Sequence, residues 1–157
     1  MKSLLSLIAI GLLAMTLESN EAGAQSDPEN TLVMELEHGT VRIEMLPELA
    51  PKHVEQIKTL TRQGFYDGIV FHRVIDGFMA QAGDPTGTGR GGSDMPDIPA
   101  EFSAEPFERG VAGMARTQDP NSANSQWFIT LAPARFLDRQ YTVWGRVIEG
   151  MEYVDMI

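Results

Sequence analysis

The chain has 157 residues, 43% hydrophobic and 22% charged, a composition typical of a soluble globular domain with a core of its own. Its net charge of −10 repels phosphate backbones, so we expect no nucleic-acid partner. The absence of cysteine excludes disulfides, thiolate catalysis and cysteine-bound metals, and it suits an oxidising compartment.

The first 24 residues have the pattern of a secretory signal peptide. Lys2 gives a positive start, residues 4–17 are mostly apolar, and residues 22–24 (Ala-Gly-Ala) form a small-x-small cleavage pattern. The apolar run is short for a membrane-spanning helix, and acidic residues follow it at once. We therefore expect cleavage after Ala24, a periplasmic location and no stable membrane association afterwards. The alternative is an uncleaved membrane anchor.

Strand and helix patterns follow one another along the rest of the chain. The sequence predicts a flexible lead-in at 25–30, strands at 31–37 and 41–45, a helix from 51 to about 63, a strand-turn-strand segment at 71–84, strands at 110–115, 126–131 and 141–147, and a second helix from about 149. Many short strands with two helices favour a mainly β fold, either a barrel or a sandwich, with helices covering its open ends.

Two segments between these elements lack a regular pattern. The glycine-rich residues 85–92 would suit a phosphate-binding loop, but no Lys-Ser/Thr pair follows and no strand-to-helix context surrounds them. We therefore predict a tightly turned or flexible surface loop. Residues 94–107 contain three prolines and predict an ordered but irregular segment.

The segment from Phe71 to Asp84, FHRVIDGFMAQAGD, carries the first group of candidate site residues. Gly77 and Gly83 favour two strands joined by a turn over a helix. A turn at Gly77 would fold Arg73 back over the second strand. The simpler interpretation is a core hairpin with a surface arginine.

Strand alternation predicts which side chains of this segment share a face. It places Met79 and Gln81 on one face of the second strand and Phe78 and Ala80 on the other. Large apolar side chains, one neutral amide and one guanidinium would then lie within a short distance of one another.

Four segments of the sequence resemble one enzyme family. FHRVIDGFMAQAGD is followed by MARTQDPNSANSQWFIT at 114–130, FLD at 136–138 and VWGRVIEGM at 143–151. In this order and spacing they are similar to the cyclophilin-type peptidyl-prolyl cis-trans isomerases, and the second segment resembles the bacterial branch, which agrees with the signal peptide.

The resemblance covers one domain at 31–157 and implies a closed, antiparallel, eight-stranded β-barrel capped by two α-helices. Family members usually add a further strand after the last helix. We therefore expect that the chain is truncated at Ile157 or that its barrel closes differently.

The residue types also suit proline isomerisation on chemical grounds. Rotation about an Xaa-Pro amide has a barrier of about 18–20 kcal/mol, because the nitrogen lone pair is shared with the carbonyl group. In the twisted state this nitrogen can accept a hydrogen bond, and a guanidinium can donate it without a base or a metal. Arg73 is the candidate donor.

An apolar slot for the proline ring and polar partners for the flanking peptide complete the expected site. The resemblance implies Arg73 as the catalytic residue. It implies the following substrate-binding residues: Phe78, Met79, Gln81, Ala115, Arg116, Thr117, Gln126, Phe128, Phe136, Leu137 and Tyr141. Three of them depart from the pattern of many family members, with Phe136 for Trp, Tyr141 for His and Arg116 for Asn, which affects the expected sequence preference.

Other kinds of site are not supported. His38, His53 and His72 lack the spacing of metal ligands, and no glycine flanks Ser122 or Ser125 as a nucleophile elbow requires. We therefore expect no metal, no cofactor and no hydrolase chemistry.

We expect a monomeric isomerase that acts on proline-containing polypeptides during the folding of exported proteins. The alternative is a proline-binding chaperone or assembly module with incidental catalysis. Arg73 favours the enzyme, because binding a ground-state proline requires the pocket but not this donor.

Overall fold

The computed structural model describes residues 27–157, so the predicted signal peptide at 1–24 lies outside the described residues. Seven strands form one antiparallel sheet in the order β1-β2-β7-β5-β6-β4-β3. The strands are β1 (Thr31–Leu36), β2 (Gly39–Met45), β3 (Arg73–Ile75), β4 (Met79–Ala82), β5 (Val111–Met114), β6 (Trp127–Thr130) and β7 (Val143–Glu149).

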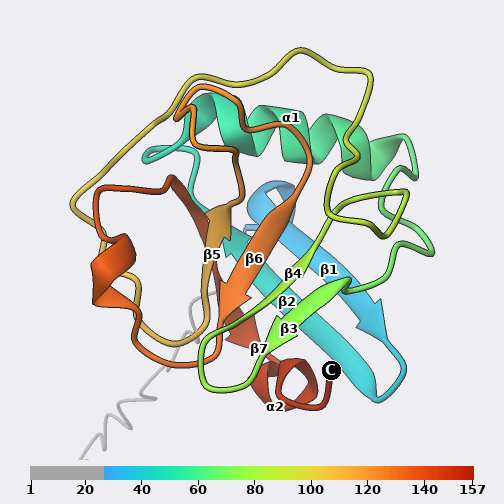
Figure 1. Cartoon of the computed structure of the whole chain (residues 1–157). Helices are drawn as coiled ribbons and strands as arrows, with labels where there is room; N and C mark the ends of the chain where they lie inside the picture. The colour runs from blue at the N-terminus through green and yellow to red at the C-terminus, as the bar shows by residue number, and fades with distance from the viewer. Residues whose placement is uncertain (1–26) are drawn as a thin grey trace, which may run out of the picture.

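Two α-helices and two short 3-10 helices complete this part of the chain. They are α1 (Pro51–Arg62), α2 (Met151–Val154), η1 (Pro28–Asn30) and η2 (Arg135–Leu137). Figure 1 shows α1 above the sheet and α2 at its lower end. The predicted mainly β, antiparallel fold with two helices is confirmed.

The sheet curls into part of a barrel and has two free edges. Within residues 27–157, β1 pairs only with β2 and β3 pairs only with β4. The described chain thus has seven strands, and the closed barrel of eight strands stays a prediction.

The segment before β1 differs from the expected flexible lead-in. Residues 28–30 form η1, because the side chain of Asp27 accepts a hydrogen bond from the backbone N–H of Glu29 at 3.0 Å. The carboxylate of Glu29 also pairs with the guanidinium of Arg62 on α1 at 2.7 Å. These contacts fix the start of the domain against α1.

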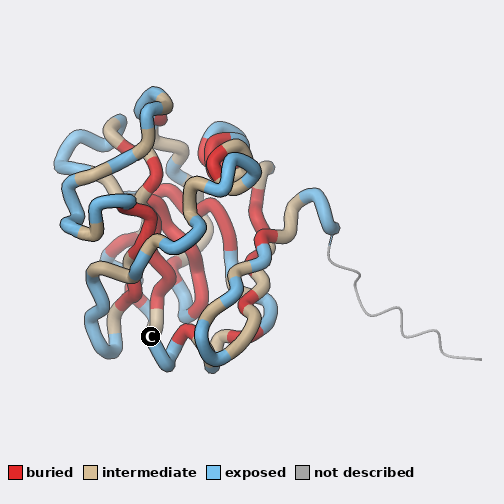
Figure 2. The backbone as a smooth tube through the Cα atoms, turned by 90° about the vertical axis from the view of Figure 1, so that its right-hand side faces the viewer, coloured by how far each residue is buried: buried red, intermediate tan, exposed pale blue. Residues whose placement is uncertain are grey.

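The interior of the curled sheet is filled with apolar side chains. Figure 2 shows the buried residues as red segments of the backbone, concentrated in the middle of the molecule. Trp144 of β7 is fully buried and lies edge to face with Trp127 of β6, their ring centroids 6.0 Å apart. α1 covers this core with Val54 and Ile57, which are at most 1% exposed. Helical spacing of apolar residues correctly predicted this face of α1.

A loop carboxylate caps the N-terminus of α1. Ala50 provides no side-chain cap. Glu101, from the irregular segment, instead accepts hydrogen bonds from the backbone N–H groups of Lys52 (3.3 Å) and His53 (2.9 Å). The Nδ1–H of the buried His53 ring donates to the same carboxylate at 2.6 Å. Burial lowers the pKa of His53, although Glu101 opposes this shift.

We expect the free energy of unfolding to decrease as the pH falls below about 6.5, the ordinary pKa of His53. A group whose pKa is lower in the folded state binds fewer protons there, so acid favours the unfolded chain. One such group changes this free energy by at most about 1.4 kcal/mol per pH unit. Urea titrations between about pH 5 and pH 8 measure the slope. His53→Gln should flatten it, and an unchanged slope would contradict the assignment.

Candidate active site

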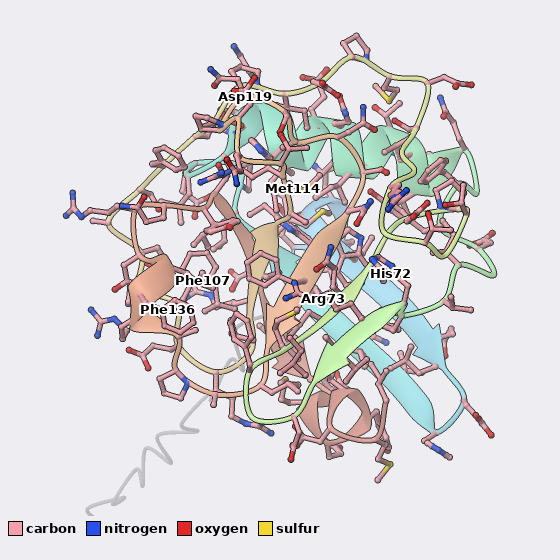
Figure 3. All side chains as sticks on the ribbon, viewed as in Figure 1. His72, Arg73, Phe107, Met114, Asp119 and Phe136 are labelled. Atoms are coloured by element: carbon pink, nitrogen blue, oxygen red, sulfur yellow. The ribbon has the colours of Figure 1, made fainter. Side chains whose placement is uncertain are left out.

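A tight hairpin brings Arg73 over the neighbouring strand. β3 and β4 are joined by a turn in which Gly77 has a φ of +69°, and Arg73 lies opposite Gln81 in the register. The Arg73 Nη1 atom donates to Oε1 of Gln81 at 3.3 Å. Figure 3 shows the Arg73 side chain at the front of the sheet, beside β4 and β6. The predicted strand-turn-strand arrangement is therefore present.

A small cavity of about 130 Å³ opens beside this guanidinium. It is lined by Arg73, Phe78, Met79, Gln81, Ala115, Arg116, Phe128, Leu137 and Tyr141. Pockets for drug-sized ligands span about 300–1,000 Å³, so this cavity is suited to a single small side chain or ring. Apolar side chains such as those of Phe78, Met79 and Phe128 share its wall with two guanidinium groups, those of Arg73 and Arg116.

The floor of the cavity is part of the hydrophobic core. Phe128 of β6 is 5% exposed and stacks on the buried Phe107, with ring centroids 5.8 Å apart and planes inclined by 22°. Gly113 of β5 leaves room for both rings, because an added Cβ would lie 2.7 Å from Phe107 and closer still to Phe128. The ring of Phe128, which forms the floor, is therefore packed between the cavity and the buried ring of Phe107.

The rim of the cavity carries a second aromatic pair. Phe136 of η2 is 71% exposed, and its ring centroid lies 5.4 Å from that of Phe78. Phe136 does not line the cavity itself. Its ring extends the apolar surface outward from Phe78, and both Phe136 and Phe107 are labelled in Figure 3.

A larger cavity of about 610 Å³, lined mainly by polar residues and glycines, adjoins the first. Gln81, Ala115 and Arg116 line both cavities. The Arg116 guanidinium lies 4.4 Å from the centroid of the Tyr141 ring and donates to the carbonyl oxygens of Thr117 (2.9 Å) and Gln140 (2.6 Å). Together the cavities form a small slot, with several apolar side chains in its wall, that is continuous with a larger groove.

Two glutamines connect Arg73 to the glycine-rich loop at 85–92. Gln81 Nε2 donates to Gln126 Oε1 at 2.9 Å. Gln126 Nε2 donates in turn to the carbonyl oxygens of Gly89 (3.0 Å) and Gly91 (2.8 Å). An unbroken chain of hydrogen bonds therefore joins the guanidinium to a loop that lines the larger cavity.

Most of the predicted site residues lie together. Eleven of the twelve line one of the two cavities, and Phe136 lies at the rim. Alternation predicted Phe78 and Met79 on opposite faces of the second strand. Phe78 instead belongs to the turn before β4, and both side chains line the small cavity. The catalytic and binding roles of these residues stay a prediction.

One wall of the larger cavity consists of residues that the sequence did not predict as part of the site. Residues 89–92 of the glycine-rich loop also line it, together with Ser93, Asp97, Ser122, Asn124 and Ser125. The available signal was an aspartate, Asp84, placed just before alternating threonines and glycines, since such a carboxylate readily accepts hydrogen bonds from the next backbone N–H groups.

Within 27–157, no group of three or more His, Cys, Asp or Glu side chains is placed to hold a metal ion. Nor is any helix of this part of the chain long and apolar enough to cross a membrane.

This fold and site combine a ring-sized cavity beside the Arg73 guanidinium with a larger groove that adjoins it. A sequence model described as cyclophilin type peptidyl-prolyl cis-trans isomerase/CLD matches residues 31–157. A probable peptidyl-prolyl cis-trans isomerase of Brucella suis is 50% identical over 97% of this chain and 83% of its own length. A peptidyl-prolyl cis-trans isomerase of Schizosaccharomyces pombe is 44% identical over 72% of this chain and 75% of its own length.

Solved structures agree with these sequence comparisons. The cyclophilin AquaCyp293 from Hirschia baltica has a TM-score of 0.75 at 34% identity, over 82% of this chain and 67% of its own. A Cryptosporidium parvum cyclophilin type isomerase, solved in the presence of the dipeptide Ala-Pro, has a TM-score of 0.75 at 29% identity, over 80% of this chain and 84% of its own. The chain belongs to the cyclophilin-type peptidyl-prolyl cis-trans isomerase family.

Proposed function

We propose that this protein accelerates rotation about Xaa-Pro bonds by holding the proline ring in the small cavity and donating a hydrogen bond from Arg73 to the twisted amide. The observation that carries the proposal is the position of the Arg73 guanidinium on the wall of a ring-sized cavity that Phe78, Met79, Phe128 and Leu137 also line. The larger cavity would receive the peptide that precedes the proline, with Gln81, Gln126 and the backbone at 115–117 as polar partners.

The rate enhancement would come from an interaction made only in the transition state. A planar amide nitrogen shares its lone pair with the carbonyl group and is a poor acceptor, whereas the nitrogen of a twisted amide is a good one. A donor that finds its acceptor only in the twisted state lowers the barrier without strengthening ground-state binding. Gln81 supports this role, because its carbonyl oxygen holds the guanidinium in place.

An NMR exchange assay on a proline tetrapeptide tests the proposal without a coupled protease. The mature chain should increase the cis-trans exchange rate at catalytic concentration. The alternative of a proline-binding chaperone predicts saturable peptide binding with no change in that rate. This second outcome would overturn the proposal.

We expect turnover to be nearly constant between about pH 6 and pH 9, wherever the protein stays folded. Arg73, Gln81 and Gln126 do not change protonation in this range, and the mechanism moves no proton. Exchange rates at a fixed peptide concentration across this range give the profile. A bell-shaped profile would instead indicate an acid and a base, and the hydrogen-bond mechanism would have to be abandoned.

We further propose that the protein acts on exported proteins as a monomer in the periplasm, free of the membrane. The signal-peptide pattern at 1–24 and the absence of cysteine support this location. A fusion of residues 1–24 to a reporter that is active only after export tests it, with Leu12→Arg as an export-blocking control. An unprocessed, inactive reporter would contradict export. The molecular mass of the mature chain, measured by sedimentation, tests whether it is a monomer.

The closed barrel of eight strands also remains a proposal. It is supported by a groove of about 430 Å³ along β1, whose lining includes Leu32, Met34, Phe71 and Trp127. A further strand beside β1 would cover this apolar surface and pair with its free edge. Protection of the outward-facing amides of β1 against hydrogen exchange tests the closure, and rapid exchange would argue against it.

A further inference from the structure

We propose that Asp84 is a positioning residue that fixes the orientation of Arg73 through the glycine-rich loop and two glutamines. Asp84 lines neither of the two cavities, so it does not belong to the expected substrate-contacting set. The inference rests on the proposed role of Arg73 and adds a residue that acts on Arg73 from a distance.

The carboxylate of Asp84 organises the loop that follows it. Asp84 is 1% exposed. Its Oδ1 atom accepts hydrogen bonds from the backbone N–H and the hydroxyl of Thr86, both at 2.8 Å. Its Oδ2 atom accepts from the N–H groups of Thr88 (3.1 Å), Gly89 (2.6 Å) and Gly91 (3.1 Å). Both oxygens are therefore surrounded by donors.

This environment also keeps the carboxylate charged. Burial by itself would raise the pKa of Asp84, but the hydrogen bonds from Thr86, Gly91 and Gly89 outweigh burial and hold that pKa well below its usual range. A side chain that carries a donor of its own cannot reproduce the arrangement, because it would face backbone N–H groups.

The glycines that bond to Asp84 also determine the orientation of the Gln126 side-chain amide. Gly89 and Gly91 give their N–H groups to Asp84, and their carbonyl oxygens accept from Gln126 Nε2. The NH₂ group of the Gln126 side chain therefore donates to the loop. Its acceptor end faces Gln81 Nε2, which leaves the Gln81 oxygen for Arg73.

The direction of this chain of hydrogen bonds is fixed at the loop. A side-chain amide has one donor end and one acceptor end, so a flipped Gln126 would place its oxygen against two carbonyl oxygens. A flipped Gln81 would place its NH₂ group against the Arg73 guanidinium, donor against donor. An ordered loop therefore keeps an acceptor, rather than a donor, beside the catalytic guanidinium.

Asp84→Asn tests the inference, because it keeps the size of the side chain and replaces one acceptor oxygen by a donor. We expect kcat for the proline tetrapeptide to fall about ten-fold or more, while the peptide Kd stays within about three-fold. Glu101→Gln is the matched control, since Glu101 also accepts backbone N–H groups but lines neither cavity. It should lower stability and leave kcat near the wild-type value.

A double-mutant cycle shows whether the effect of Asp84→Asn on kcat passes through Gln81 or arises from a general disturbance of the fold. Gln81→Ala breaks the chain next to Arg73, so adding Asp84→Asn to it should change kcat by less than about two-fold. If Asp84→Asn lowers kcat by the same factor with and without Gln81, the effect does not pass through Gln81 and the proposal is wrong. Wild-type kcat for Asp84→Asn overturns it equally.

A second variant covers the case in which Asp84→Asn does not fold. Gln126→Leu leaves the anchor at Asp84 intact and removes the link between the loop and Gln81. It should show the same loss of kcat and the same non-additivity with Gln81→Ala, and full kcat would overturn the proposal. The Arg73→Ala variant distinguishes failure of this inference from failure of the proposed function. If Arg73→Ala remains active, the proposed function is wrong. If Arg73→Ala is inactive and Asp84→Asn is not, only the positioning role fails.

Discussion

Replacing Arg73 by alanine should lower kcat/KM for a proline tetrapeptide by about 100- to 1,000-fold. Removal of one donor that stabilises transition-state charge typically has an effect of this size. Because the hydrogen bond to the amide nitrogen would form only in the twisted state, the loss should be in kcat, with the peptide Kd changed by less than about three-fold. NMR exchange rates and a peptide titration give the two quantities.

Arg73→Lys is the matched control for charge. Lysine keeps the positive charge but is a point donor on a flexible stem and does not reproduce the planar fork that contacts Gln81. We expect it to recover only a small part of the lost activity. Normal turnover by a folded Arg73→Ala protein would show that the guanidinium is not the catalytic group, and full recovery by lysine would show that charge alone is sufficient.

Gly83→Ala should lower the free energy of unfolding by about 2–5 kcal/mol, combining backbone strain with overpacking. Gly83 follows β4 with a φ of +96°, which other residues rarely adopt. A Cβ at this position would lie 2.8 Å from the Cα of Gln126 and even nearer to the carbonyl oxygen of Ser125. The backbone on the β6 side would have to move away. Urea unfolding followed by tryptophan fluorescence measures the loss.

Gly77→Ala separates the two causes of that loss. Gly77 also has a positive φ, +69°, but nothing lies within 4 Å of an added Cβ. Its variant should therefore be destabilised only by backbone strain, about 1–2 kcal/mol. Equal losses in the two variants would show that the close approach to Ser125 and Gln126 contributes nothing.

Local patterns predicted the elements whose signal repeats along the chain. The β1–β2 hairpin and α1 were found because alternation and helical spacing extend over several residues. η2, which carries Phe136 and Leu137, has only three residues and no such repeat. The η1 helix depends on the side chain of Asp27, a single contact that composition does not reveal.

The site was predictable as a set of residue types but not as a geometry. Gln81 and Gln126 were both candidates, yet their hydrogen bond joins positions 45 residues apart in the sequence and depends on the register of β4 against β6. The role of Asp84 rests on backbone N–H groups, which every residue except proline has. The sequence therefore indicates a turned loop but not which carboxylate orders it.

If the small cavity holds the proline ring as proposed, the stacking of Phe107 on Phe128 couples the range of rings that it accepts to the stability of the fold. Any change that enlarges the floor of the small cavity also removes a contact from the core, so wider rings can be admitted there only in a less stable protein. Phe136 at the exposed rim carries no such penalty. Evolution or engineering of this enzyme toward new peptides should therefore alter the rim and the larger groove first and leave the aromatic floor unchanged.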